Sequence, residues 1–85
     1  MICQASDLIL IRENLSTRLS LLRKEAGISQ EELGKAIGLK QFTISDIERG
    51  RRLTSVEILD ALAEYFNTTT DYLLGRSDSR ERQAQ

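Results

Sequence analysis

The sequence contains no histidine and no proline, and it has a single cysteine, Cys3. Without histidine, the chain can build neither a Cys/His zinc site nor a Ser/His or Cys/His catalytic pair. One cysteine cannot form an internal disulfide, so we expect a reducing, cytoplasmic setting. The absence of proline, with only five glycines among 85 residues, favours helices.

Long apolar runs are also absent. The longest, Leu8 to Ile11, is far shorter than the roughly 20 residues that a membrane-spanning helix needs. The N-terminus lacks the basic start of a secretory signal. With 40% hydrophobic and 29% charged residues, the composition is that of a soluble globular protein. The length allows one small domain. We predict no membrane association and no cofactor or metal.

Charge is unevenly distributed, although the net charge is only −1. Residues 15–52 carry eight basic and five acidic side chains, whereas residues 53–75 carry four acidic and no basic ones. This distribution predicts a dipolar domain whose positive part lies in the first half of the chain. Taken alone, the imbalance is equally compatible with an ordinary solvated surface.

Helix-period spacing of apolar residues predicts five helices and no strand, so the expected fold class is all-α. The first helix is expected to begin at an Asn14 cap and to end at Gly27. Its apolar face is predicted to be Leu15, Leu19, Leu22 and Ala26.

The second helix has the clearest start signal. Ser29 as N-cap with Glu32 three residues later forms a capping box, and Ile28 and Leu33 have the spacing of a hydrophobic staple. We expect this helix to end at Gly38, where glycine can take the left-handed conformation. The third helix has the same staple spacing at its start, between Leu39 and Ile44, and should end near Gly50.

The last two helices also have recognisable starts. The fourth is predicted to begin at a Thr54 cap with Glu57 completing the box, and Leu53 facing Ile58. Its core face is expected to be Ile58, Leu62, Ala63 and Phe66. The fifth is short, with Thr69 as its cap and Asp71 in its first turn, and contributes Tyr72, Leu73 and Leu74 before Gly75.

Two ends fall outside this set of helices. Residues 76–85 have no apolar residue except Ala84, so we predict a flexible polar tail there. Residues 1–14 form an N-terminal extension whose four aliphatic residues, 8–11, fit neither a strict helical stripe nor a long strand. This extension either lengthens the first helix or covers an apolar surface on this subunit or a partner. The domain itself is expected over residues 15–75.

The second and third helices have the spacing of a helix-turn-helix unit. Gly34 lies in the middle of the second helix at a cost of about 1 kcal/mol relative to alanine, which is reasonable if a side chain there would collide with the third helix. Gly38 ends the second helix. The buried-type positions of the unit are Leu33, Ile37, Leu39, Ile44 and Ile47.

With these residues in place, a family resemblance can be stated. Residues 15–75 resemble the five-helix, lambda-repressor-like domain of the phage repressor and Cro group, the XRE family. The resemblance is carried by LSTRLSLLRKEAGISQEELGKAIG, by ISDIERG and by TTTDYLLG. It implies a transcriptional regulator, mostly dimeric in this family and expected here to be a repressor, whose third helix contacts double-stranded DNA.

Candidate base contacts lie on the outer face of the third helix, because Ile44 and Ile47 are expected to turn inward. They are Gln41, Phe42, Ser45 and Asp46. Gln41 can pair with an adenine edge through two hydrogen bonds, and Phe42 can contact a thymine methyl group. Packing of Phe42 against the N-terminal segment is an equal alternative. Asp46 either accepts from a cytosine amino group or pairs with Arg49 or another basic side chain.

Phosphate contacts need positive charge and hydrogen-bond donors at the rims of the groove. Lys40 occupies an N-cap position where the family usually has serine or threonine, and it should cost about 1 kcal/mol in the free protein. We expect it to face a phosphate, or else simply to point outward. Thr43 can contact the DNA backbone or its own preceding carbonyl. The candidate phosphate contacts are Ser29, Gln30, Lys40, Thr43, Arg49, Arg51 and Arg52.

Arg23 and Glu48 match a pair that forms a largely buried ion pair in many relatives, so the resemblance implies a structural pair here.

Three classes of function remain. A DNA-binding regulator is favoured; an enzyme is nearly excluded because no nucleophile-base pair, metal cluster or phosphate loop is visible. The alternative is a protein-interaction module or an antitoxin-type partner protein on the same fold.

Overall fold

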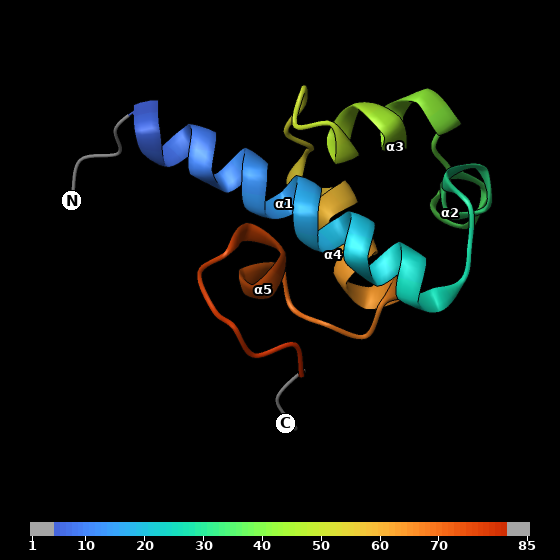
Figure 1. The fold of residues 1–85 in the computed structure, drawn as a ribbon. Coiled ribbons are helices and arrows are strands. Elements are labelled where there is room, and N and C mark those ends of the chain that lie inside the picture. Colours follow the sequence, from blue (N-terminus) through green and yellow to red (C-terminus); the bar gives the residue numbers. More distant parts are fainter. Residues whose placement is uncertain (1–4, 82–85) are drawn as a thin grey trace.

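The computed structural model describes residues 5–81, and this part of the chain folds into five helices without a strand (Figure 1). α1 crosses the molecule, with α3 on one side and α5 on the other, and packs against both. α2 packs against α3 and α4, and α4 packs against α5. The predicted all-α, five-helix fold is confirmed. The helices are α1 (Ala5–Ala26), α2 (Gln30–Ile37), α3 (Gln41–Glu48), α4 (Val56–Tyr65) and α5 (Thr70–Leu74).

One hydrophobic core is shared by all five helices. α1 contributes three leucines and α3 contributes two isoleucines, and the side chains of the other helices close around them. Burial of aliphatic side chains at this density is the main favourable contribution to the free energy of folding. Residues with less than 2% exposure are Leu15, Leu19, Leu33, Ile44, Ile47, Leu62, Leu73 and Thr68.

The first helix is longer than predicted. α1 begins at Ala5, so Asn14 lies inside it and is not its cap; the Asn14 side chain donates to the Leu10 carbonyl at 3.0 Å. The N-terminal extension therefore lengthens the helix. The predicted face is also wrong at its end, because Ala26 is exposed. Among residues 5–81, no helix has the length and apolar character that crossing a membrane requires.

The caps of α2 and α5 are confirmed. Ser29 accepts from the Glu32 amide at 3.0 Å, and the Glu32 carboxylate accepts from the Ser29 amide at 3.0 Å. Gly38 ends α2 in the left-handed conformation, with φ at 79°. Thr69 caps α5 by accepting from the Tyr72 amide at 3.0 Å.

The cap of α4 is one residue later than predicted. Ser55, not Thr54, accepts from the first turn, at 3.3 Å from the Ile58 amide. The Thr54 hydroxyl is buried and has no hydrogen-bond partner among residues 5–81, so it does not cap α4. The core face of α4 accordingly includes Leu59, which was not predicted, while Ile58 and Phe66 pack at the margin of the core.

The part of the predicted tail that the structure describes, residues 76–81, lies against α1 and α5. Arg18 of α1 donates to the carbonyls of Tyr72 and Ser77 at 2.7 and 2.8 Å, and pairs with Asp78 at 2.9 Å. Arg80 pairs in turn with Glu25 of α1. Residues 1–4 and 82–85, which belong to the predicted extension and tail, lie outside the described residues.

Gly34 sets the distance between α2 and the turn that follows it. A Cβ atom at this position would lie 2.5 Å from the Leu39 carbonyl oxygen, closer than atoms can approach. The same turn is closed by the Leu39 amide, which donates to the Gly34 carbonyl at 2.7 Å. The expected collision is confirmed, but the neighbour is the turn before α3 and not α3 itself. Because this contact is between main chains, a side-chain rotation cannot relieve it.

Replacing Gly34 with alanine should lower the free energy of unfolding by about 1–3 kcal/mol, because the turn must move to admit the methyl group. Helix propensity alone predicts the opposite sign, a gain of about 1 kcal/mol. Chemical denaturation followed by circular dichroism measures the difference. Lys35→Ala, at the exposed neighbouring position, is the control and should stay within about 0.5 kcal/mol of the parent. A Gly34→Ala variant as stable as the parent would contradict the contact.

Candidate nucleic-acid interface

α3 buries one side and presents the other to solvent. Ile44 and Ile47 are fully buried, as predicted. Because residues one turn apart share a face, this burial fixes which side chains of α3 point outward. Gln41, Phe42 and Arg49 are exposed, and Ser45 and Asp46 are partly exposed.

A buried ion pair fixes the C-terminal end of α3. The Arg23 Nε and Nη2 atoms donate to the two carboxylate oxygens of Glu48 at 2.6 and 3.0 Å. The two side chains are only 13% and 6% exposed. The hydrogen bond to Glu48 raises the pKa of Arg23, outweighing the desolvation that lowers it, and the negative charge of Glu48 adds to the increase. The pair implied by the resemblance is present.

Further hydrogen bonds satisfy the atoms that this pair leaves open. Gln30 of α2 donates from Nε2 to Glu48 at 3.2 Å, and Arg23 also donates to the Ile28 carbonyl at 2.9 Å. The Ser16 hydroxyl of α1 donates to the main-chain carbonyl of Glu48. Three helices therefore meet at Glu48. The hydrogen bonds of Gln30 and Ser16 to Glu48 could not be predicted from the sequence, because neither contact follows from local spacing.

Asp46 pairs with Arg52 and not with Arg49. The closest distance between the Arg52 guanidinium and the Asp46 carboxylate is 3.8 Å, with the side chains 48% and 30% exposed. The loop after α3 folds back on the same residue, since the Arg51 amide donates to the Asp46 carbonyl at 2.9 Å. This arrangement places a positive charge beside the one carboxylate among the candidate base contacts.

Lys40 begins α3 without capping it. Its backbone is extended, its side chain makes no cap hydrogen bond, and its amino group lies 5.8 Å from the centroid of the Phe42 ring. Phe42 is 59% exposed, so the ring is open to solvent on its other side. The Lys40 side chain therefore leaves the first-turn amides of α3 unsatisfied, and the cost of about 1 kcal/mol stays a prediction.

The remaining candidates surround this face. Arg49, Arg51 and Arg52 are exposed at the end of α3 and in the loop that follows. Ser29 is engaged in its capping box, and the Gln30 amide group is held by Glu48. Both residues lie at the N-terminal end of α2, where main-chain N–H groups point outward and favour an anion. Thr43 is partly buried.

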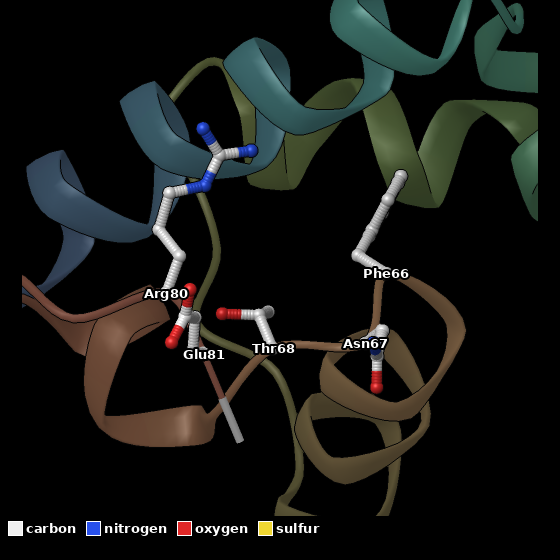
Figure 2. A pocket seen from close by; sticks show the side chains of 5 residues that line it. All are labelled: Phe66, Asn67, Thr68, Arg80 and Glu81. Carbon is white, nitrogen blue, oxygen red and sulfur yellow. The ribbon is translucent and has the colours of Figure 1, made fainter. Parts of the chain in front are cut away.

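A pocket elsewhere on the surface lacks the electrostatics of a phosphate site. It is lined by Phe66, Asn67 and Thr68 after α4, and by Arg80 and Glu81 of the C-terminal segment (Figure 2). Arg80 is already paired with Glu25, and Glu81 adds a negative charge. The outer face of α3 is therefore the better candidate for binding a polyanion.

The sequence profile of the helix-turn-helix family matches residues 19–73, and the chain belongs to this family. The resemblance to the XRE family stated from the sequence is confirmed at the level of this helix-turn-helix family. The matched residues include α2, the turn with Gly38 and α3, together with most of the core.

Individual relatives carry related names. The chain is 37% identical to the HTH-type transcriptional regulator AnsR of Bacillus subtilis over 68 residues, which cover 80% of this chain and 59% of AnsR. It is 32% identical to the HTH-type transcriptional regulator ImmR of the same organism, covering 76% of this chain and 51% of ImmR. It is 39% identical to the ImmF control region 10 kDa protein of Bacillus phage phi105, covering 60% and 57%. The chain thus spans between half and three fifths of these relatives. No solved structure matches it significantly.

Replacing Glu48 with alanine should destabilise the protein by about 3–5 kcal/mol, because it leaves the Arg23 guanidinium buried and unpaired. The double replacement of Arg23 and Glu48 by alanine should be less destabilising than the sum of the single ones. Urea denaturation of the four proteins gives the coupling free energy. Glu57→Ala, on the exposed face of α4, is the matched control for loss of a carboxylate. A coupling free energy near zero would show that the pair does not hold α3.

Proposed function

We propose that this protein is a sequence-specific regulator of transcription that binds double-stranded DNA by inserting α3 into the major groove. The observation that carries the proposal is the fixed orientation of α3, whose apolar side is buried and whose end is anchored at Glu48. The names of the relatives, which are transcriptional regulators, support the same function. A cytoplasmic setting belongs to this proposal.

The charge distribution supports binding on this side. Residues 15–52, which include most of α1 together with α2 and α3, carry eight basic and five acidic side chains, whereas residues 53–75, which include α4 and α5, carry four acidic and no basic ones. Duplex DNA attracts the first and repels the second. The electrostatic field therefore orients the protein so that α3 approaches the groove.

Within this proposal the candidate side chains form two groups, one that contacts base edges and one that contacts phosphates. Gln41, Phe42, Ser45 and Asp46 contact base edges, because they lie on the outward face of α3. Phosphates are contacted by donors and cations around that face, which set the position and register of the protein on the duplex. This second group is Ser29, Gln30, Lys40, Thr43, Arg49, Arg51 and Arg52.

We further propose a homodimer bound to a near-palindromic site, with the two α3 helices about 34 Å apart in successive major grooves. One α3 of eight residues contacts too few base pairs to specify a site by itself. Repression is the proposed output, because it requires only that the dimer occupy its site.

A protein partner is the second candidate, and the surface of α4 favours it. α4 exposes three acidic side chains, those of Glu57, Asp60 and Glu64, and no basic one. A surface with charges of one sign is compatible with a partner that has a basic surface. Such a contact leaves α3 free, so it can coexist with DNA binding.

Selection of bound duplexes from a random library tests the proposed function. We expect enrichment of a site with two related halves, and the affinity for that site should fall roughly a thousandfold or more between about 50 and 200 mM salt. Gln41→Ala should change which sequences are enriched, whereas Arg51→Ala should weaken all of them alike. No enrichment, or affinity that does not depend on salt, would contradict DNA binding and favour the protein partner.

Lys40→Ser should act in opposite directions on stability and on binding. A serine cap should raise the free energy of unfolding by about 1 kcal/mol, because it accepts from the first turn of α3. The loss of a phosphate contact should weaken DNA binding and reduce the salt dependence by about one ion. Thermal denaturation and fluorescence anisotropy measure the two effects. An unchanged salt dependence would show that Lys40 does not face a phosphate.

A further inference from the structure

The outer face of α3 presents two side chains of opposite chemistry, one helical turn apart. Phe42 and Asp46 are separated by four residues and therefore lie next to each other on the same face. Each has a cation beside it, Lys40 at 5.8 Å from the ring centroid and Arg52 at 3.8 Å from the carboxylate. An apolar ring and a carboxylate are the two groups least suited to a surface that contacts phosphates. Contacts with bases, and not with phosphates, would account for their position on this face.

The Phe42 ring is chemically suited to thymine. It is 59% exposed and offers neither a donor nor an acceptor to a base edge. Among the groups that the four base pairs display in the major groove, the thymine methyl group is the apolar one. A base with only polar groups at this place would lose water without gaining a hydrogen bond.

The Asp46 carboxylate is chemically suited to cytosine. An ionised carboxylate only accepts hydrogen bonds, so it is repelled by the acceptors of guanine and thymine. Adenine has an amino donor, but its N7 acceptor lies next to it, whereas cytosine shows only its amino group. Arg52 offsets the negative charge, which lets the carboxylate approach the groove between two phosphate chains.

The helical spacing sets the distance between the two bases. A recognition helix lies across the duplex axis in the major groove, and side chains about one helical turn apart contact neighbouring base pairs. Phe42 and Asp46 therefore match adjacent positions. We propose that each half of the operator contains a thymine and a cytosine at adjacent base pairs, contacted by Phe42 and Asp46 respectively. This inference rests on the proposed function and adds the identity of two bases to it.

Replacing thymine with uracil in the selected duplex tests the first contact without changing the protein. Uracil lacks the methyl group and keeps every polar group of thymine. We expect binding about fourfold weaker for each substituted half-site, the effect of one buried methyl-sized group. The same DNA substitution should have no effect on Phe42→Ala. Val56→Ala, which removes an exposed aliphatic side chain from α4, should retain the fourfold effect.

Asp46→Asn tests the second contact. An asparagine can donate as well as accept, so it should pair with adenine, and selection with this variant should replace the cytosine by adenine. Binding to the original site should weaken roughly tenfold, because the new amide group opposes the cytosine amino group with a donor. Glu57→Gln removes a carboxylate from α4 and should select the same sequence as the parent.

The outcomes separate this inference from the function on which it rests. A library with no enriched sequence overturns both. An enriched site overturns the inference alone in either of two cases. One is that uracil weakens the parent and Phe42→Ala equally at every thymine. The other is that Asp46→Asn selects the parent sequence. Circular dichroism of each variant confirms that the helices are intact.

Discussion

The ion pair between Arg23 and Glu48 is the interaction on which the arrangement of the other elements depends. It joins the long first helix to the last residue of α3, and Gln30 adds a hydrogen bond from α2. Removing two charges from water is unfavourable unless every donor and acceptor finds a partner. Because these groups are partnered only in one geometry, a rotation or shift of α3 would leave a charge unpaired. The orientation of the polar face of α3 follows from this requirement.

Local chemistry made much of the fold predictable. Ser29 and Thr69 were identified as caps because a hydroxyl before an apolar run, with an acidic residue in the first turn, satisfies main-chain amides in only one way. Gly34 was identified because glycine inside a helix costs stability unless space is needed there. Threonine and serine are adjacent at the start of α4, however, and local spacing favoured Thr54. In the structure Ser55 is the cap, and the Thr54 hydroxyl is buried.

The candidate face was predictable in outline, but its electrostatics were not. Periodicity alone separates Ile44 and Ile47 from the outward side chains of α3, and the structure agrees. The pairing of Asp46 with Arg52 depends on how the loop after α3 folds back. The predicted start of α1 at Asn14 is wrong because asparagine is a good cap in isolation; of the two alternatives for residues 1–14, the structure shows a longer helix that begins at Ala5.

The structure combines a rigid support with a face that is suboptimal for the free protein. Lys40 fails to cap α3, Phe42 is open to solvent and Asp46 brings a carboxylate to the proposed binding side. Under the proposed function, phosphates and base edges relieve the first two, whereas the carboxylate needs a hydrogen-bond donor on a base to offset the nearby phosphates. Titration of the isotopically labelled protein with its selected duplex, followed by amide chemical shifts, tests this most directly. We predict that the largest changes map to residues 40–52 and the start of α2. Changes confined to α4 would contradict the account.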